Sequence, residues 1–308
     1  MTGAAQVSVV MSVYNGAAQL PETLDSVLSQ RDCDLELIVV NDGSSDDSPG
    51  ILDRYAAKES RLRVIHQRNT GLTLALATGC AEASGEFIAR QDAGDISLPG
   101  RLVGQLGFLR SHPQAVMCCG GVRFVGPLRE PLFQVQMPME QLDKGLRQLS
   151  TGNFQGPPHH GATMFRADAY RQAGGYRLPF VVAQDIDLWL RLSEIGQCLG
   201  LTETMYEARV EMASISSRRR KDQLQMCALA IACTQARNEG RAEPLLADRA
   251  LPTTSPARAM DGWERARFHY FVASCLRSTD PVAARRYYWM ATRENPLHFK
   301  ALLRSVLG

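Results

Sequence analysis

The chain has 308 residues, of which 45% are hydrophobic and 21% charged, enough for one large domain with an appendage or for two domains. Its 34 Lys and Arg residues against 32 Asp and Glu residues leave a net charge of +2, which does not favour general nucleic-acid binding. There is no apolar stretch of about 20 residues and no signal-peptide pattern, so we expect no membrane-spanning segment. Eight scattered cysteines without a Cys-x-x-Cys pair favour reduced thiols and a cytoplasmic protein.

The first third of the chain alternates short apolar runs with amphipathic segments. The predicted strands are 7–14, 35–40, 62–65 and 86–91, and the helices between them are 20–29, 47–58 and 71–84. This alternation predicts an α/β fold in which a mostly parallel sheet is covered by helices on both faces.

The remainder is less regular at first and then helical. Further helices are predicted at 101–111, 185–195, 263–277 and 281–294, and strands at 115–119, 122–125 and 161–165. Strand signals disappear from Lys221 onward, and a Pro-rich loop spans 252–256. We predict one α/β domain over residues 1–215 and a helical C-terminal extension over residues 216–308.

Polar turns follow three of the predicted strands: Tyr14–Asn15–Gly16, Asn41–Asp42–Gly43, and Asp92–Ala93–Gly94–Asp95. Because ligands of open parallel sheets bind at the carboxyl ends of the strands, these side chains would share one site. Asn, Asp and Gly also make ordinary turns, which is the simpler interpretation of any one of them. Three such turns at one edge favour a ligand site.

Three segments resemble family 2 glycosyltransferases: VSVVMSVYNG at 7–16, LIVVNDGSSD at 37–46 and GEFIARQDAGD at 85–95. The resemblance covers about residues 7–215. It implies a GT-A nucleotide-binding fold and inverting transfer of a sugar from a nucleoside-diphosphate donor to an acceptor hydroxyl. The implied setting is surface polysaccharide or glycolipid synthesis, with a saccharide or lipid-linked acceptor, on the cytosolic side of a membrane.

The same resemblance implies roles for individual residues of the donor site. Tyr14 and Asn15 would line the nucleotide pocket, and Asp42 would accept a hydrogen bond from the base. Asp92 would lie near the ribose, and Arg90 belongs to the same donor-binding set.

A divalent cation, Mn²⁺ or Mg²⁺, is implied at Asp95 and Asp92, because hard oxygen ligands can hold an ion that neutralises the leaving diphosphate. The family commonly has Asp-x-Asp-Asp here, and this chain has Gly94 at the second acidic position. Three alternatives follow: Asp95 takes over as ligand, the metal is held through water, or basic groups carry the charge instead.

Asp185 is the candidate catalytic base. Family members often have Glu-Asp where this chain has Gln184–Asp185, and inverting transfer needs a carboxylate that takes the proton of the incoming hydroxyl. The simpler alternative is an ordinary helix N-cap. Asp187 and Arg191, four residues apart, predict a structural ion pair on the same helix.

Two other features are weaker. His159, His160 or Arg166 could face the acceptor or the diphosphate, although loop histidines are usually only polar. The basic run 218–221 is interpreted first as a solvated helix face. A lid over the diphosphate and peripheral contact with anionic lipid at the inner face of the membrane are its alternatives.

Two rival functions are considered. A sugar-nucleotide pyrophosphorylase needs a basic glycine-rich loop after the first strand, and residues 15–21 contain no Lys or Arg. A glycosyltransferase-like protein that binds or scaffolds without catalysis is favoured by Gly94 and Gln184. The retained carboxylates at Asp42, Asp92, Asp95 and Asp185 favour the enzyme. The sequence specifies neither the sugar nor the oligomeric state.

Overall fold

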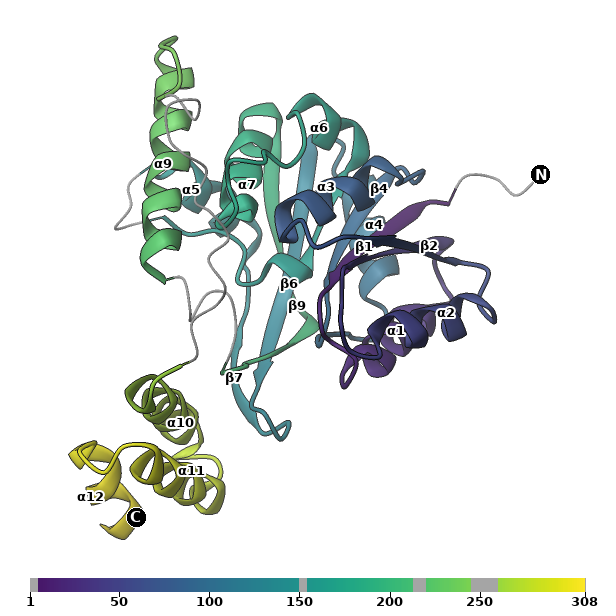
Figure 1. The fold of residues 1–308 in the computed structure, drawn as a ribbon. Coiled ribbons are helices and arrows are strands. Elements are labelled where there is room, and N and C mark those ends of the chain that lie inside the picture. Colours follow the sequence, from purple (N-terminus) through teal and green to yellow (C-terminus); the bar gives the residue numbers. More distant parts are fainter. Residues whose placement is uncertain (1–4, 150–153, 213–219, 245–259, 308) are drawn as a thin grey trace. The chain divides into compact units, whose positions relative to one another are not determined.

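A computed structural model describes residues 5–149, 154–212, 220–244 and 260–307 (Figure 1). By its contacts the chain divides into two units, which we describe separately. The first comprises Met1–Val122, Val135–Ala208 and Lys221–Thr253, and the second comprises Arg123–Gln134, Arg209–Arg220 and Thr254–Gly308. The predicted domain boundary between residues 215 and 216 stays a prediction.

Within the described residues the strands form one nine-stranded sheet in the order β3-β2-β1-β4-β8-β6-β9-β5, with β7 paired to β6. The strands are β1 (Val7–Val13), β2 (Leu35–Asp42), β3 (Leu62–Gln67), β4 (Phe87–Asp92), β5 (Ile96–Ser97), β6 (Ala115–Val125), β7 (Pro131–Val135), β8 (Thr163–Arg166) and β9 (Gln197–Arg209). Strands β3, β2, β1 and β4 run parallel, as predicted, whereas β8 is antiparallel to β4 and to β6.

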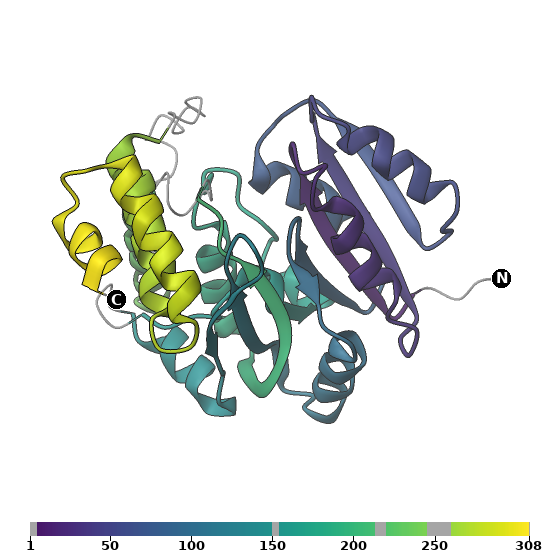
Figure 2. The same cartoon turned by 90° about the horizontal axis from the view of Figure 1, so that it is seen from below.

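The helices of the first unit cover this sheet from both sides (Figures 1 and 2). They are α1 (Leu20–Leu28), α2 (Ser48–Ala56), α3 (Leu72–Ala81), α4 (Arg101–Ser111), α5 (Met139–Arg147), α6 (Ala167–Gln172), α7 (Gln184–Ile195) and α9 (Arg220–Asn238). Alternate residues of β1 point to opposite faces, as the strand period of two requires. Val9 and Met11 pack in the core cluster that contains α1, α2 and α4. Val10 faces α3, where it lies so close to Gly79 that a Cβ there would come within 2.7 Å of its Cγ1.

The middle of the chain differs from the prediction. The two strands predicted at 115–119 and 122–125 are one continuous strand, β6. The strand predicted at 161–165 begins two residues later, because His160–Ala162 form a 3-10 turn. Strand β9 and helix α5 were not predicted. The burial of β9 changes along its length, so it has no simple alternating pattern. Helix α5 does carry a helical pattern, with Leu142, Gly145 and Leu146 buried on one side, and sequence analysis overlooked it.

In the second unit, α10 (Gly262–Leu276), α11 (Pro281–Glu294) and α12 (Phe299–Leu307) pack together, with Tyr287 and Tyr288 in their core. The predicted helices at 263–277 and 281–294 are confirmed, and α12 is additional. Helix α9 instead packs in the first unit, where Met226, Leu229 and Ile231 meet Phe180 and Leu190. The predicted loop 252–256 and residues 218–219 of the basic run lie outside the described residues. Among the helices that the structure describes, none combines the length and apolarity needed to cross a bilayer.

Candidate active site

The carboxyl ends of β1, β2 and β4 lie together, because Val13 of β1 pairs with Asn41 of β2 and Ser12 pairs with Asp92 of β4. The turns that follow β1 and β2 are joined by hydrogen bonds. Asn15 adopts a φ of 53°, and its Oδ1 accepts a bond of 2.8 Å from the Ser45 backbone N–H. Tyr14 is 56% exposed beside this turn. The sheet therefore brings the predicted nucleotide-pocket residues to one edge.

Asp42 is almost completely buried and organises the loop after β3. Its Oδ1 accepts hydrogen bonds from the Thr70 backbone N–H at 2.9 Å and from Gln67 Nε2 at 2.8 Å. Its Oδ2 accepts a bond of 2.9 Å from the Gly71 backbone N–H. Because a carboxylate oxygen has two lone pairs, Oδ2 has capacity for a second donor such as a nucleotide base.

Gly43 allows this loop to approach the end of β2. A Cβ at this position would lie 2.5 Å from the Asn69 backbone nitrogen, and the φ of Gly43 is +75°. Any side chain would both collide with the loop and strain the backbone, so the turn after Asp42 requires glycine.

Three groups capable of holding a metal ion meet just beyond β4. One ligand atom from each of Asp92, Asp95 and His159 lies within 4.8 Å of the others. His159 Nδ1 lies 3.8 Å from Asp92 Oδ2, and His159 Nε2 lies 3.6 Å from Asp95 Oδ2. The structure thus places a histidine beside the two carboxylates predicted as metal ligands, which neither the sequence spacing nor the resemblance identified.

Tyr206 on β9 connects this cluster. Its hydroxyl donates to Asp95 Oδ2 at 3.0 Å and accepts from the Asp92 backbone N–H at 3.1 Å. The His159 ring stacks on the Tyr206 ring with 5.5 Å between centroids. Sequence analysis missed Tyr206 because it belongs to an unpredicted strand 111 residues from Asp95.

The loop after β4 adopts a conformation that suits the glycine at position 94. Gly94 has a φ of +99°, where an aspartate would be strained, and its N–H donates to Thr23 Oγ1 at 3.0 Å. Asp95, the next residue, is the one directed at Tyr206 and His159. Among the three alternatives, this arrangement favours Asp95 as the ligand that replaces the missing carboxylate.

Among the residues that the structure describes, Arg90 contacts the site through Asp92. Its side chain is fully buried, and its guanidinium donates to the Val10 carbonyl, to the Gln91 carbonyl and, at 2.8 Å, to Asp92 Oδ1. Burial works to raise the pKa of Asp92, but the nearby basic groups, Arg90 foremost, with His159, His160 and Arg101, together outweigh it and lower that pKa. Asp92 is therefore held as a carboxylate, the form that binds cations.

Arg101, a fully buried residue of α4, lies below the cluster of Asp92, Asp95 and His159 and was not among the predicted site residues. Its guanidinium donates to the Arg90 carbonyl at 2.7 Å and to the Gly161 carbonyl at 2.6 Å. It also lies 4.8 Å from the centroid of the Tyr206 ring. Arg101 thus joins strand β4, the loop that carries His159, and Tyr206.

Asp185 lies in the first turn of α7, and its side chain accepts a hydrogen bond of 2.9 Å from the Ile186 backbone N–H. Burial raises the pKa of Asp185, and the negative charge of Asp92 adds to this effect, against local backbone hydrogen bonds and His159, which lower it. The electrostatic coupling to Asp92 and His159 associates Asp185 with the metal-ligand cluster.

Other predicted polar residues serve the fold. Asp187 is buried and forms the predicted ion pair with Arg191, at 2.6 Å, as well as a second one with Arg177. His160 Nε2 bonds the Tyr176 hydroxyl at 2.8 Å. Arg166 donates to main-chain carbonyls, at 2.8 Å to that of Ala115, so it does not serve as an anion contact.

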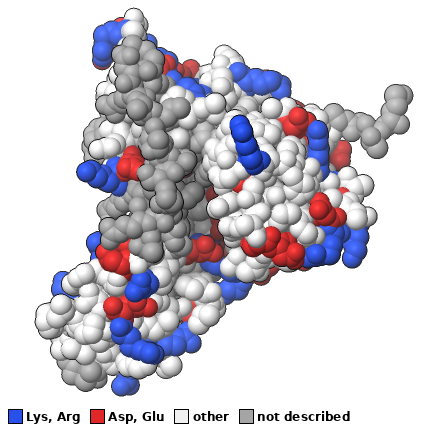
Figure 3. Space-filling model, viewed as in Figure 1, with Lys and Arg blue, Asp and Glu red and all other residues white. Residues whose placement is uncertain are grey.

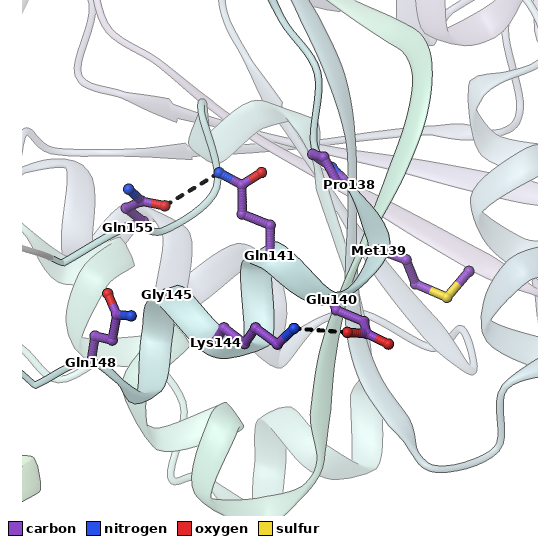
Figure 4. Close-up of a pocket in the computed structure, with 8 residues that line it drawn as sticks. All are labelled: Pro138, Met139, Glu140, Gln141, Lys144, Gly145, Gln148 and Gln155. Carbon is purple, nitrogen blue, oxygen red and sulfur yellow. Dashed lines mark hydrogen bonds and ion pairs between the residues drawn. The ribbon is translucent and has the colours of Figure 1, made fainter.

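A surface pocket of about 550 Å³ lies along α5 (Figure 4). Its lining includes Pro138, Gln155 and an exposed ion pair in which Lys144 Nζ lies 2.8 Å from Glu140 Oε2. It shares no residue with the carboxylate cluster.

The chain is similar in sequence to known proteins. The family model "Glycosyl transferase family 2" matches residues 8–174. EpsE of Bacillus subtilis (strain 168), which is named as a glycosyltransferase, is 34% identical over 225 residues, or 71% of this chain and 78% of EpsE. The amylovoran biosynthesis glycosyltransferase AmsE of Erwinia amylovora is 27% identical over 237 residues, or 74% of this chain and 86% of AmsE.

Solved structures show the same fold. S. aureus TarS 1-349 in complex with UDP-GlcNAc has a TM-score of 0.57 at 16% identity, covering 97% of this chain and 88% of that one. The mannosyltransferase PcManGT from Pyrobaculum calidifontis, in complex with GDP-Man and Mn²⁺, has a TM-score of 0.57 at 20% identity, covering 98% of this chain and 79% of that one. The predicted GT-A fold is confirmed, and the chain is a glycosyltransferase that belongs to glycosyl transferase family 2.

Proposed function

We propose that the chain transfers a sugar from a nucleoside-diphosphate donor to an acceptor hydroxyl with inversion at the anomeric carbon. The observation that carries this proposal is the convergence of Asp92, Asp95 and His159 at the carboxyl end of β4. Asp92 and His159 also act on the pKa of Asp185. Positive charge at this edge of the sheet would stabilise the leaving diphosphate. The acceptor hydroxyl needs a base on the side opposite the leaving group.

The donor set fits a divalent cation. Two carboxylates with one imidazole suit Mn²⁺ better than Mg²⁺, because Mg²⁺ prefers oxygen ligands alone. When bound, such an ion supplies Lewis-acid stabilisation of the leaving diphosphate. Tyr206 holds Asp95 in place, and Arg90 helps to keep Asp92 ionised.

Asp185 is proposed as the general base that accepts the proton of the acceptor hydroxyl at a carboxylate oxygen. Its raised pKa supports this role, because a base takes up a proton more readily as its pKa approaches the working pH. Tyr14, Asn15 and Asp42 are proposed to bind the nucleoside, with Asp42 Oδ2 accepting a hydrogen bond from the base.

The relatives support the class of donor and acceptor. The TarS and PcManGT structures hold UDP-GlcNAc and GDP-Man, which supports a nucleotide-sugar donor here. AmsE is named for amylovoran biosynthesis, which supports a role in making a surface polysaccharide. We propose a saccharide or lipid-linked acceptor.

The test is a comparison of binding with turnover. The full chain is assayed with a panel of UDP- and GDP-sugars, with and without Mn²⁺, and the anomeric configuration of the product is read by NMR. We expect Asp185→Asn to bind the donor with unchanged affinity and to lose about 100-fold or more in turnover. Asp168→Asn, an exposed aspartate in the first turn of α6, is the matched control and should keep full activity.

Two outcomes would refute parts of the proposal. Near-normal transfer by a folded Asp185→Asn protein excludes this residue as the base. Donor binding without any turnover, in the wild type and with every acceptor offered, supports the binding or scaffold alternative that Gly94 and Gln184 raised.

A further inference from the structure

The second unit exposes an unusual surface along α11 and the start of α12. Of the described residues 281–303, every exposed one is apolar or cationic. The large apolar side chains on this surface, with their exposed fractions, are Val282 (83%), Trp289 (54%), Leu297 (63%), Phe299 (70%) and Leu303 (60%). We call this surface the α11–α12 face. Exposed apolar groups at this density mark an interaction site rather than ordinary surface.

The spacing on α11 gathers these groups on one side. Val282, Trp289 and Arg293 are separated by seven and four residues, so they lie on one helix face. The opposite face, which includes Tyr287 and Tyr288, is buried in the core of the unit. The Arg293 guanidinium lies 4.7 Å from the centroid of the Trp289 ring. Aromatic and cationic groups are therefore presented together to the outside.

The charge of the face has one sign. Arg285, Arg286, Arg293 and Lys300 are exposed on it, and in Figure 3 Lys and Arg side chains stand among uncharged ones over α11. The acidic residue in this stretch, Glu294, is only partly exposed and pairs with Arg265 at 2.5 Å. Arg286 is partly neutralised by Glu130 of the same unit, at 2.9 Å.

Helix α10 shows that this pattern belongs to the face and not to the whole unit. Helix α10 also exposes two aromatic residues, Trp263 and Phe271, but its exposed charges have both signs, the acidic Glu264 and the cationic Arg267, and the polar Ser274 is exposed as well. Such a mixed surface is typical of a helix that faces water.

We propose that the α11–α12 face docks the protein on a membrane surface that contains anionic lipids. A helix face that combines Trp, Phe and Leu with Arg and Lys lies in the interface of a bilayer, with the aromatic rings at the headgroup level. Each cation near an anionic surface strengthens binding by about fivefold at moderate ionic strength. A second copy of this chain would present the same positive charge, which opposes docking of this face on itself. This surface is not the basic run 218–221, for which sequence analysis considered contact with anionic lipid. The proposal does not depend on which donor or acceptor the protein uses.

Sedimentation of the full chain with lipid vesicles tests the proposal. Vesicles of phosphatidylglycerol and phosphatidylcholine in equal parts are compared with vesicles of phosphatidylcholine alone. We expect binding to the anionic vesicles, release at high salt, and at least about a tenfold weaker partition to the neutral ones.

Two double variants separate the contributions of charge and apolar contact. Arg293→Gln with Lys300→Gln should weaken partition by about 25-fold, since each cation contributes about fivefold. Trp289→Ser with Leu303→Ser should weaken it at every salt concentration. The matched controls lie in the first unit, where Arg171→Gln and Leu178→Ser change exposed residues of the same types and should bind as the wild type does.

Three results would overturn the proposal: equal binding to neutral vesicles, binding that survives both double variants, or no binding at all. Gel filtration tests the alternative that the face binds a second copy of the chain. Self-association that disappears in the variant with Trp289→Ser and Leu303→Ser would identify the face as a contact between copies. Circular dichroism of each variant shows whether its fold is retained. Because the changed side chains are exposed, we expect folding to be unaffected.

Discussion

Arg101 is the buried cation on which the geometry of the metal-ligand cluster depends. We predict that Arg101→Met lowers the free energy of unfolding by about 3 kcal/mol. The substitution removes the donors to the Arg90 and Gly161 carbonyls, which are bound at 2.7 and 2.6 Å, and to the side chains of Gln91, Ser97 and Gln105. The side chains can turn to other partners, but the two main-chain carbonyls cannot. A buried polar group left without a partner costs about 1–3 kcal/mol, so the two carbonyls give about 2–6 kcal/mol. Removing the guanidinium also removes the free-energy cost of burying its charge, which offsets part of this loss.

Urea unfolding followed by circular dichroism measures the change. Arg110→Met is the matched control on the same helix, because Arg110 is 45% exposed and makes one ion pair, at 3.2 Å, with Glu86. Its loss should cost less than about 1 kcal/mol. Arg101→Lys should fall between the two, since an ammonium group has fewer donors and no planar fork.

The same variants report on the site. Because Arg101 bonds the loop that carries His159 and packs on Tyr206, we expect Arg101→Met to raise the Mn²⁺ concentration needed for half-maximal activity. If Arg101→Met unfolds at the same urea concentration as the wild type and keeps its metal requirement, the buried network does not hold the cluster and our reasoning is wrong.

Three further predictions concern other parts of the first unit. His159→Ala should raise the half-saturating Mn²⁺ concentration by about tenfold or more, because a proposed metal ligand is removed. It should lower the free energy of unfolding by only about 1 kcal/mol, because the stacking on Tyr206 and one hydrogen bond from the Gly161 N–H are lost with it. An unchanged metal requirement would remove His159 from the ligand set. Gly43→Ala should lower the free energy of unfolding in urea by about 2 kcal/mol or more, because the new Cβ would lie 2.5 Å from the Asn69 backbone nitrogen at a φ of +75°. Its control, Gly107→Ala, has open space around the new Cβ and should be neutral or stabilising. Burial works to raise the pKa of Glu243, but hydrogen bonds from two arginines outweigh it and lower the pKa to about 2 from 4.5. This carboxylate therefore stabilises the fold above pH 4.5 and ceases to do so as the pH falls toward 2. Glu243→Gln should lower the free energy of unfolding by about 1–2 kcal/mol at pH 7, and its urea midpoint should converge with that of the wild type in acid. A difference in urea midpoint that stays constant with pH would contradict the assignment.

The parallel half of the fold could be predicted because its signals are local. Buried runs such as Leu35–Val40 end in polar turns, and the alternation with helices fixes a parallel sheet whose carboxyl ends share one edge. The roles of Asp42, Asp95 and Asp185 came from the resemblance and remain predictions, although the structure is compatible with each.

The rest of the site depends on pairings between distant parts of the chain. Tyr206 meets Asp95 across 111 residues, and Arg101 bonds Gly161 across 60. No periodicity marks these residues, because a tyrosine in a strand or an arginine at the start of a helix is unremarkable until the fold places it. His159 was considered only as a loop histidine for the same reason.

The packing of α9 has a consequence for producing shorter forms of the protein. A fragment that stops at residue 215 would lack Met226, Leu229 and Ile231 and would leave Phe180 and Leu190 facing water. It would also lose Glu243, whose carboxylate accepts a hydrogen bond of 2.6 Å from Arg177, the residue that also binds Asp187 on α7. The shortest soluble truncation that keeps the α7 helix in place is therefore expected to extend past Glu243.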